Sequence, residues 1–146
     1  CEKIRLCAVA QLVNNLHALF LSAGDKCVCT PTYHVFDMFK PHKGAECLTT
    51  VAPDGISASA SVKDGRMTVT MANLTPDRDI EVSLSPVGFT VGGRASLTFL
   101  GNGDLHAYNS FDEPERVKTV SETRENFDGI VALPRGSVLS AVFDVE

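Results

Sequence analysis

The stretch Ile56-Ser57-Ala58-Ser59-Ala60-Ser61-Val62-Lys63-Asp64-Gly65-Arg66-Met67-Thr68-Val69-Thr70-Met71 alternates apolar and polar residues on both sides of an Asp-Gly pair. A period of two is typical of a strand that buries one face. Asp-Gly supplies the positive φ angles of a type I′ turn, which joins two antiparallel strands. The stretch therefore predicts a β-hairpin with strands over 56–62 and 67–71.

Comparable strand signals continue to the C-terminal end of the chain. We expect further strands at Ile80–Leu84, Ala95–Leu100, Val117–Val120 and Val138–Val145. Prolines and glycine-rich breaks separate these segments, and we expect Gly92-Gly93 to form a turn. Short strands at regular spacing are typical of an antiparallel sandwich or jelly roll. Residues 44–146 are therefore predicted to form a β-sandwich domain.

The first third of the chain has a different pattern. Residues 4–10 are almost continuously apolar, which fits a parallel strand covered on both faces. Residues 12–22 predict a loop with a helical turn or a short helix, and Ala23-Gly24-Asp25 predicts a turn. Residues 1–43 then read as strand, loop and helix, which is one unit of a β/α barrel.

The helix of this unit has a clear start and stop. Thr30 is a suitable N-cap and Pro31 suits the first helical position. Pro41 and Gly44 end the helix. Its apolar face is expected to carry Tyr33, Phe36, Met38 and Phe39.

Composition excludes several classes of protein. The 146 residues are 44% hydrophobic and 21% charged, as in ordinary globular proteins. The net charge of −5, with scattered basic residues, argues against nucleic-acid binding. No apolar run approaches the ~18 residues of a membrane span, so no membrane partner is expected. The start at Cys1, without a leader, is typical of a fragment or a processed product, so the compartment stays open.

All five cysteines lie in the first third: Cys1, Cys7, Cys27, Cys29 and Cys47. An odd, clustered set is not a disulfide framework, and we expect free thiols packed as small buried hydrophobes. Free thiols slightly favour a reducing, cytoplasmic compartment. A metal site built from Cys27, Cys29 and His34 is conceivable, but packed thiols are the favoured interpretation, and no metal is expected.

Gln11 is the strongest candidate for a binding residue. It follows the predicted strand at the end where barrel enzymes build their sites. Its amide donates and accepts hydrogen bonds at once, as recognition of sugar hydroxyls requires. From spacing alone, a ligand contact and an ordinary polar residue at a strand end are about equally favoured.

Three ordered segments carry a resemblance to a known family. Arg5-Leu6-Cys7-Ala8-Val9-Ala10-Gln11-Leu12-Val13-Asn14 is similar to the eighth-strand signature of the family 51 glycoside hydrolases, the α-L-arabinofuranosidases. Thr30-Pro31-Thr32-Tyr33-His34-Val35-Phe36-Asp37-Met38 resembles their eighth helix. His106-Ala107-Tyr108-Asn109-Ser110-Phe111, followed by an acidic run with proline, resembles their sandwich signature, with Tyr108 for His and Ser110 for Thr.

The resemblance implies a (β/α)₈ barrel with a C-terminal β-sandwich. It implies release of terminal α-L-arabinofuranosyl groups from arabinan or arabinoxylan glycans, with retention and without a metal or organic cofactor. A sugar-contacting glutamine at the eighth-strand end corresponds to Gln11. The family's acid/base and nucleophile glutamates lie on earlier strands, so we expect no catalytic residue in this chain and no activity from it alone. The missing barrel portion and further copies in a homo-oligomer are the expected partners.

The chain's own carboxylates fit this expectation. A glycosidase needs two carboxyl groups about 5–9.5 Å apart, with one held protonated. Asp112, Glu113 and Glu115 cluster around Pro114 in a predicted loop. The other candidates occupy turn signatures, at Asp25, Asp54, Asp64 and Asp104.

An alternative is a non-catalytic sandwich module that binds carbohydrate or assembles oligomers. The chain has no Trp and two Tyr, which leaves 108–111 as the exposed aromatic candidate. The barrel interpretation makes a different prediction: Leu6, Val9, Leu12 and Leu16 lack their barrel cover, so the chain exposes an apolar patch there or self-associates.

Overall fold

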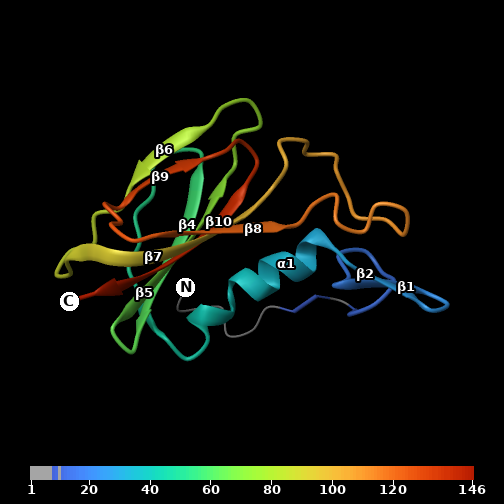
Figure 1. Cartoon of the computed structure of the whole chain (residues 1–146), viewed down its shortest axis with the longest axis horizontal. Helices are drawn as coiled ribbons and strands as arrows, with labels where there is room; N and C mark the ends of the chain where they lie inside the picture. Colours follow the sequence, from blue (N-terminus) through green and yellow to red (C-terminus); the bar gives the residue numbers. More distant parts are fainter. Residues whose placement is uncertain (1–7, 10) are drawn as a thin grey trace.

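The computed structural model describes residues 8, 9 and 11–146, and shows a mostly β protein with one α-helix beside its sheets (Figure 1). Within these residues no helix is long and apolar enough to cross a bilayer. The elements are β1 (Phe20–Ala23), β2 (Lys26–Cys29), α1 (Pro31–Met38), the 3₁₀ helix η1 (Lys40–His42), β3 (Glu46–Leu48), β4 (Ile56–Lys63), β5 (Arg66–Asn73), β6 (Ile80–Ser83), β7 (Val91–Leu100), β8 (Thr119–Arg124), β9 (Ile130–Leu133) and β10 (Val138–Val145).

The predicted hairpin is confirmed as β4 and β5. Their register pairs Lys63 with Arg66 across the turn. Asp64 and Gly65 have φ angles of 51° and 72°, as a type I′ turn requires. The alternation along the two strands sends Ala60 and Val69 toward one face of the sheet, where they sit directly opposite each other.

Six antiparallel strands form the large sheet, in the order β3-β4-β5-β10-β7-β8. The last strand, β10, lies between β5 and β7, so that Ala141 faces Val69 on one side and Leu97 on the other. Strands β6 and β9 pair with each other as a separate small sheet. The small sheet lies over one face of the large sheet (Figure 1), which confirms the predicted antiparallel sandwich.

The main core fills the space between the two sheets. Its largest fully buried apolar side chains are Phe143, Leu97, Leu133, Leu139 and Val131. The rings of Phe127 and Phe143 lie 5.3 Å apart, which adds an aromatic contact to the burial of their area. These residues come from β7, β9, β10 and the segment before β9, so the core depends on pairings between distant parts of the chain.

Three sequence expectations differ from the structure in this domain. Gly92 and Gly93 lie inside β7 rather than in a turn. Gly93 has a φ of 70°, and the register between β7 and β10 shifts between Phe143 and Val145, so the two glycines form a β-bulge within the strand. Val117 precedes β8 rather than starting it, because its backbone N–H and C=O form hydrogen bonds with the Asn109 side chain instead of with a neighbouring strand. Strands β3 and β9 were not predicted, because three or four residues are too short for a period to show.

The helix packs on the opposite face of the large sheet. Thr30 caps it, with its hydroxyl accepting from Tyr33 N at 3.4 Å, and Pro31 is the first helical residue, as predicted. Met38 is buried against Leu100 and Val117 in a second small core. Phe36 and Phe39, which we predicted on the same apolar face, are exposed. The eight-residue helix and its C-cap Phe39 therefore leave two large aromatic side chains uncovered, although α1 contacts β7 and β10.

Residues 12–19 form the predicted loop, with a turn at Leu16 and His17, but the loop ends before residue 22 because a hairpin begins at Phe20. Strands β1 and β2 pair from Phe20↔Cys29 to Ala23↔Lys26, and the predicted turn at Gly24 is confirmed, with a φ of 59°. The strand predicted over 4–10 lies almost wholly outside the described residues, since residues 1–7 and 10 are not described. The domain boundary between 43 and 44 stays a prediction.

Candidate functional site

Gln11 lies on the surface, directly before a structured loop. Its side chain is exposed, and the next residue, Leu12, accepts backbone hydrogen bonds from Leu19 and Phe20, each at 3.0 Å. The strand that Gln11 is predicted to follow is outside the described residues. Its place at a strand end therefore stays a prediction, while its accessibility to a ligand is a feature of the structure.

Asn14 fixes the loop that follows Gln11 to the β1–β2 hairpin. Its amide nitrogen donates to Ser22 O at 2.8 Å, and its amide oxygen accepts from Ser22 N at 2.7 Å. The Asn14 backbone adopts a φ of 54°, which asparagine tolerates better than most residues. This pair of hydrogen bonds imitates the backbone pairing of a β-ladder with a single side chain. The backbone that follows Gln11 is therefore held in one position against the hairpin.

Asn109 joins the sandwich to the end of that hairpin. It is 2% exposed, and its amide nitrogen donates to Cys29 O at 2.9 Å and to Val117 O at 2.8 Å. Its amide oxygen accepts from Val117 N at 2.7 Å. In the sequence, Asn109 stands out only as part of the family signature; no local pattern could show its role, because Cys29 is 80 residues away.

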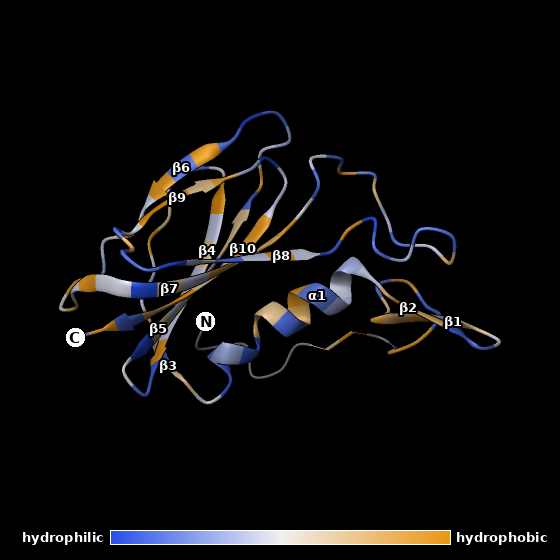
Figure 2. Ribbon diagram, viewed as in Figure 1, coloured by the Kyte–Doolittle hydropathy of each residue, from blue (hydrophilic) through white to orange (hydrophobic). Residues whose placement is uncertain are grey.

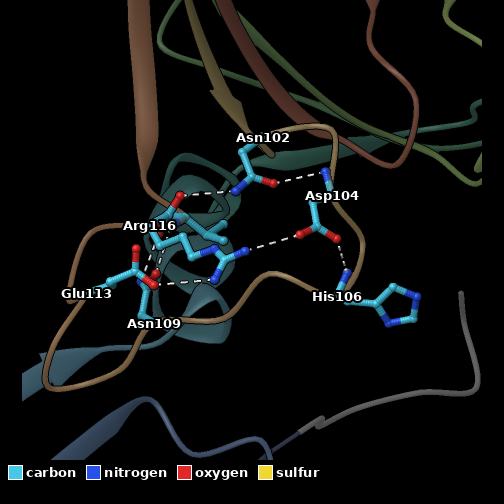
Figure 3. A network of polar contacts seen from close by, with 7 residues as sticks. Asn102, Asp104, His106, Asn109, Glu113 and Arg116 are labelled. Carbon is cyan, nitrogen blue, oxygen red and sulfur yellow. Dashed lines mark hydrogen bonds and ion pairs between the residues drawn. The ribbon is translucent and has the colours of Figure 1, made fainter.

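The loop that carries Asn109 is held by a polar network (Figure 3). Arg116 lies 3.3 Å from a carboxylate oxygen of Asp104 and 3.3 Å from one of Glu113. Asn102 accepts from Asp104 N at 3.0 Å, and Asp104 accepts from His106 N at 2.9 Å. The predicted turn role of Asp104 is thereby confirmed, and Glu113 serves as an ion-pair partner.

The described carboxylates share one property: every Asp and Glu in residues 8–9 and 11–146 is exposed. A general acid in a glycosidase is kept protonated near neutral pH by an apolar pocket or a neighbouring carboxylate. No described carboxyl group lies in such a pocket. The described part of the chain therefore offers exposed acids that pair with arginine or lysine, such as Glu113 and Glu115.

The expectation of buried thiols is wrong for two cysteines. Cys27 and Cys47 are exposed, and Cys29 is partly buried; Cys1 and Cys7 lie outside the described residues. Cys27 lies beside buried Val28 on a two-stranded hairpin that packs only one face. Partial burial, with a smaller contribution from Cys27, raises the pKa of the Cys29 thiol. Within the described residues no three His, Cys, Asp or Glu side chains are grouped as a metal site.

Exposed apolar side chains accumulate in the segment around Gln11. Leu12, Val13 and Leu16 are all exposed, Leu16 by 82%. Phe36 of α1 and Phe39, which follows the helix as its C-cap, are exposed as well. Val9 is partly buried, and Leu6 lies outside the described residues. Of the four residues predicted to lack a barrel cover, Leu12 and Leu16 are thus exposed as expected.

His42 connects this N-terminal region to the sandwich sheet. Its Nδ1 lies 2.7 Å from Ser61 Oγ and its Nε2 lies 3.0 Å from Thr70 Oγ1. A neutral imidazole donates from one nitrogen and accepts at the other, and each hydroxyl can take the matching role. Burial lowers the pKa of His42, so the neutral ring is the form that this contact favours.

The lowered pKa of His42 predicts a pH-dependent stability. The unfolded chain binds the proton more tightly than the folded one, so the contribution is fully present above the unfolded pKa of about 6.5. It is lost as the pH falls below that value toward the lowered folded pKa. Urea unfolding at pH 7.5 and 5.0 should show a larger loss of stability for the wild type than for His42→Gln. Equal losses would contradict this role.

Comparisons with known proteins match nearly the whole chain. Residues 1–137 match the model of the family described as the alpha-L-arabinofuranosidase C-terminal domain. An intracellular exo-alpha-L-arabinofuranosidase from Bacteroides ovatus is 32% identical, over 80% of this chain and 25% of the relative. The chain thus spans about a quarter of that curated relative.

Solved structures resemble the chain over almost all of its length. The GH51 arabinofuranosidase from Xanthomonas axonopodis pv. citri is 30% identical with a TM-score of 0.85, over 98% of this chain and 32% of that enzyme. The GH51 enzyme from Thermotoga petrophila RKU-1, at 20% identity and a TM-score of 0.74 over 92% of this chain and 33% of that enzyme, shows the shared fold. Because the family model spans residues 1–137, the chain belongs to the α-L-arabinofuranosidase C-terminal domain family.

Proposed function

We propose that the chain is the C-terminal part of an α-L-arabinofuranosidase that removes terminal α-L-arabinofuranosyl residues from arabinan or arabinoxylan glycans with retention. The observation that carries this proposal is the match to the Xanthomonas GH51 enzyme over 98% of this chain, at 30% identity. Another GH51 α-L-arabinofuranosidase, which shares the fold at 16% identity and a TM-score of 0.75, was solved with arabinose bound. The substrate class and the stereochemistry belong to the proposal.

Within this enzyme, residues 1–43 form the last strand, loop and helix of the barrel and residues 44–146 form the sandwich. The exposed Leu12, Leu16, Phe36 and Phe39 support this division, because a helix and loop from a barrel need neighbouring barrel units to cover them. Gln11 lies at the active-site face and contacts the arabinose. The acid/base and nucleophile glutamates are supplied by the barrel portion outside this chain, and the enzyme assembles as a homo-oligomer.

The first experiment is the intact mass of the native gene product, with an assay of aryl α-L-arabinofuranoside hydrolysis. We expect a mass several-fold above 15.6 kDa, hydrolysis by that product, and none by the 146-residue chain. Anomeric analysis by NMR should find the α-anomer released first. A native product of only 146 residues without activity would overturn the proposal and favour the accessory-module alternative.

A further inference from the structure

The loop that joins β7 to β8 presents the most exposed aromatic ring of the described chain. Tyr108 is 66% exposed, compared with 45% for Phe36 and 39% for Phe39. Both neighbours of Tyr108 point inward, because Ala107 packs against the second small core and Asn109 is buried. Successive side chains of an extended segment point in opposite directions, so the ring of Tyr108 is directed toward solvent.

The backbone beside Tyr108 is fixed by hydrogen bonds and ion pairs. Asn109 bonds to Cys29 O and to both backbone groups of Val117. Arg116 pairs with two carboxylates of the same loop (Figure 3). A group that is held in place before a ligand arrives loses little conformational freedom on binding. The loop therefore presents the ring of Tyr108 as a preformed contact point.

The β7–β8 loop lies at the beginning of α1. A cavity of about 350 Å³ is lined by Pro31 and Thr32 of the first helical turn and by Leu105 and Ala107 of the loop. The loop, orange in Figure 1, reaches toward the same side of the molecule as the β1–β2 hairpin. In a β/α barrel each helix begins at the face where the preceding strand ends, and active sites are built at that face. In the proposed enzyme, Tyr108 therefore lies at the edge of the active-site face.

A short series of contacts connects Tyr108 to the segment that carries Gln11. Asn109 donates to Cys29 O, and Cys29 is paired with Phe20. Phe20 N donates at 3.0 Å to the carbonyl of the residue that follows Gln11. Paired strands lie about 4.8 Å apart, so these contacts together span on the order of 15 Å. Tyr108 thus lies beyond the sugar that Gln11 is proposed to contact, at a distance that a short oligosaccharide can span.

The surface around Tyr108 suits a neutral carbohydrate better than an apolar partner. Figure 2 shows the β7–β8 loop as largely hydrophilic, with only short hydrophobic segments. A tyrosine has an apolar ring face and a polar hydroxyl. A sugar has the matching chemistry, with C–H groups on the faces of its ring and hydroxyls around the edge. The loop also carries Asp112, Glu113 and Glu115, which favours an uncharged glycan over an acidic one.

We propose that Tyr108 binds the glycan chain that carries the terminal arabinosyl group, by stacking on a sugar ring beyond the one that is released. This inference rests on the proposed function, in which the chain is part of an arabinofuranosidase. The ligand is a neutral oligosaccharide, supplied either by an arabinan chain or by the backbone of an arabinoxylan. The contact is remote from the reacting bond, so it strengthens binding of the substrate and of the transition state equally. Tyr108 is then a specificity-determining residue that favours oligosaccharides over substrates with a single sugar.

The test compares substrates of different length in the intact gene product. Tyr108→Ala should lower kcat/KM about 5- to 10-fold for an arabino-oligosaccharide or an arabinosylated xylo-oligosaccharide, mainly by raising KM. A loss with either oligosaccharide supports the inference and identifies the chain that is bound. Hydrolysis of an aryl α-L-arabinofuranoside should stay within about two-fold of the wild type, because that substrate has no second sugar. Tyr108→Phe keeps the ring and should retain most of the oligosaccharide activity.

The matched control is Val120→Ala, since Val120 is 60% exposed on β8. This control should leave hydrolysis of all three substrates unchanged. Equal losses of Tyr108→Ala on the aryl substrate and the oligosaccharides, or no loss on either oligosaccharide, would overturn the inference. A melting temperature more than about 2 °C below that of the control would also overturn it, because the ring would then pack against protein. A wild-type enzyme that hydrolyses none of the substrates refutes the proposed function, whereas an active enzyme that is indifferent to Tyr108→Ala refutes only this contact.

Discussion

Gln11→Ala in the intact enzyme is expected to lower kcat/KM for an aryl α-L-arabinofuranoside about 100-fold, which corresponds to about 2.7 kcal/mol of transition-state stabilisation. The proposed contact is an amide that donates to one sugar hydroxyl and accepts from another. Alanine leaves both hydroxyls without their partner in a site shielded from water. Because the side chain is exposed in this chain, its removal should leave folding intact.

Two further variants make the Gln11 experiment decisive. Gln11→Glu keeps the shape and the acceptors but loses the N–H donors, so an intermediate kcat/KM indicates a direct hydrogen-bonding role. Asn15→Ala is the matched control, because Asn15 is exposed and its side chain accepts from Leu16 N at 2.8 Å. The control should stay within two-fold of the wild type. A Gln11→Ala enzyme with wild-type kinetics, or one with a lowered melting temperature, would count against substrate contact.

The second large effect is on stability, at Asn109. Asn109→Ala should cost about 3 kcal/mol, because it removes bonds to Val117 N, Val117 O and Cys29 O and leaves buried polar groups unpaired. Asn109→Asp should cost more, since a carboxylate oxygen would then face two carbonyl oxygens at a position that is 2% exposed. Urea unfolding of each variant measures both costs.

The control for Asn109 is Asn126, which is exposed. Its alanine and aspartate variants should stay within about 0.5 kcal/mol of the wild type, as surface substitutions usually do. Hydrogen exchange gives a second readout, because loss of the Asn109–Cys29 bond should increase exchange in the β1–β2 hairpin. Asn109 variants as stable as their Asn126 counterparts would show that this bond does not hold the hairpin to the sandwich.

Local sequence signals succeeded where the structure itself is local. The hairpin at Asp64-Gly65 needs only two positive φ angles between alternating strands, and Thr30 followed by Pro31 sets the helix start within three residues. The signals failed where a distant partner decides. Val117 looks like the start of a strand, but a side chain eight residues earlier holds its backbone. Exposed Cys27 looks like a core residue because composition cannot show which face of a hairpin packs.

The sequence alone could predict which residue of the candidate site binds a ligand and by what chemistry, but not the contacts that hold the surrounding segment in place. An amide after an apolar strand indicates Gln11, but its strand lies outside the described residues, and its role rests on the proposed function. Nothing local to Asn109 or His42 indicates that they tie the first 43 residues to the sandwich. Their partners are as much as 80 residues away for Asn109 and 28 residues away for His42.

The sequence by itself determined the sandwich class, the central hairpin and the cap of the helix, because alternation, turn chemistry and capping act between neighbours in the chain. Only the tertiary structure decided that β6 pairs with β9, that β10 lies between β5 and β7, and that Leu16 and Val87 remain exposed. Those outcomes depend on which distant segments meet and which surfaces they bury, and no short window of sequence contains both partners.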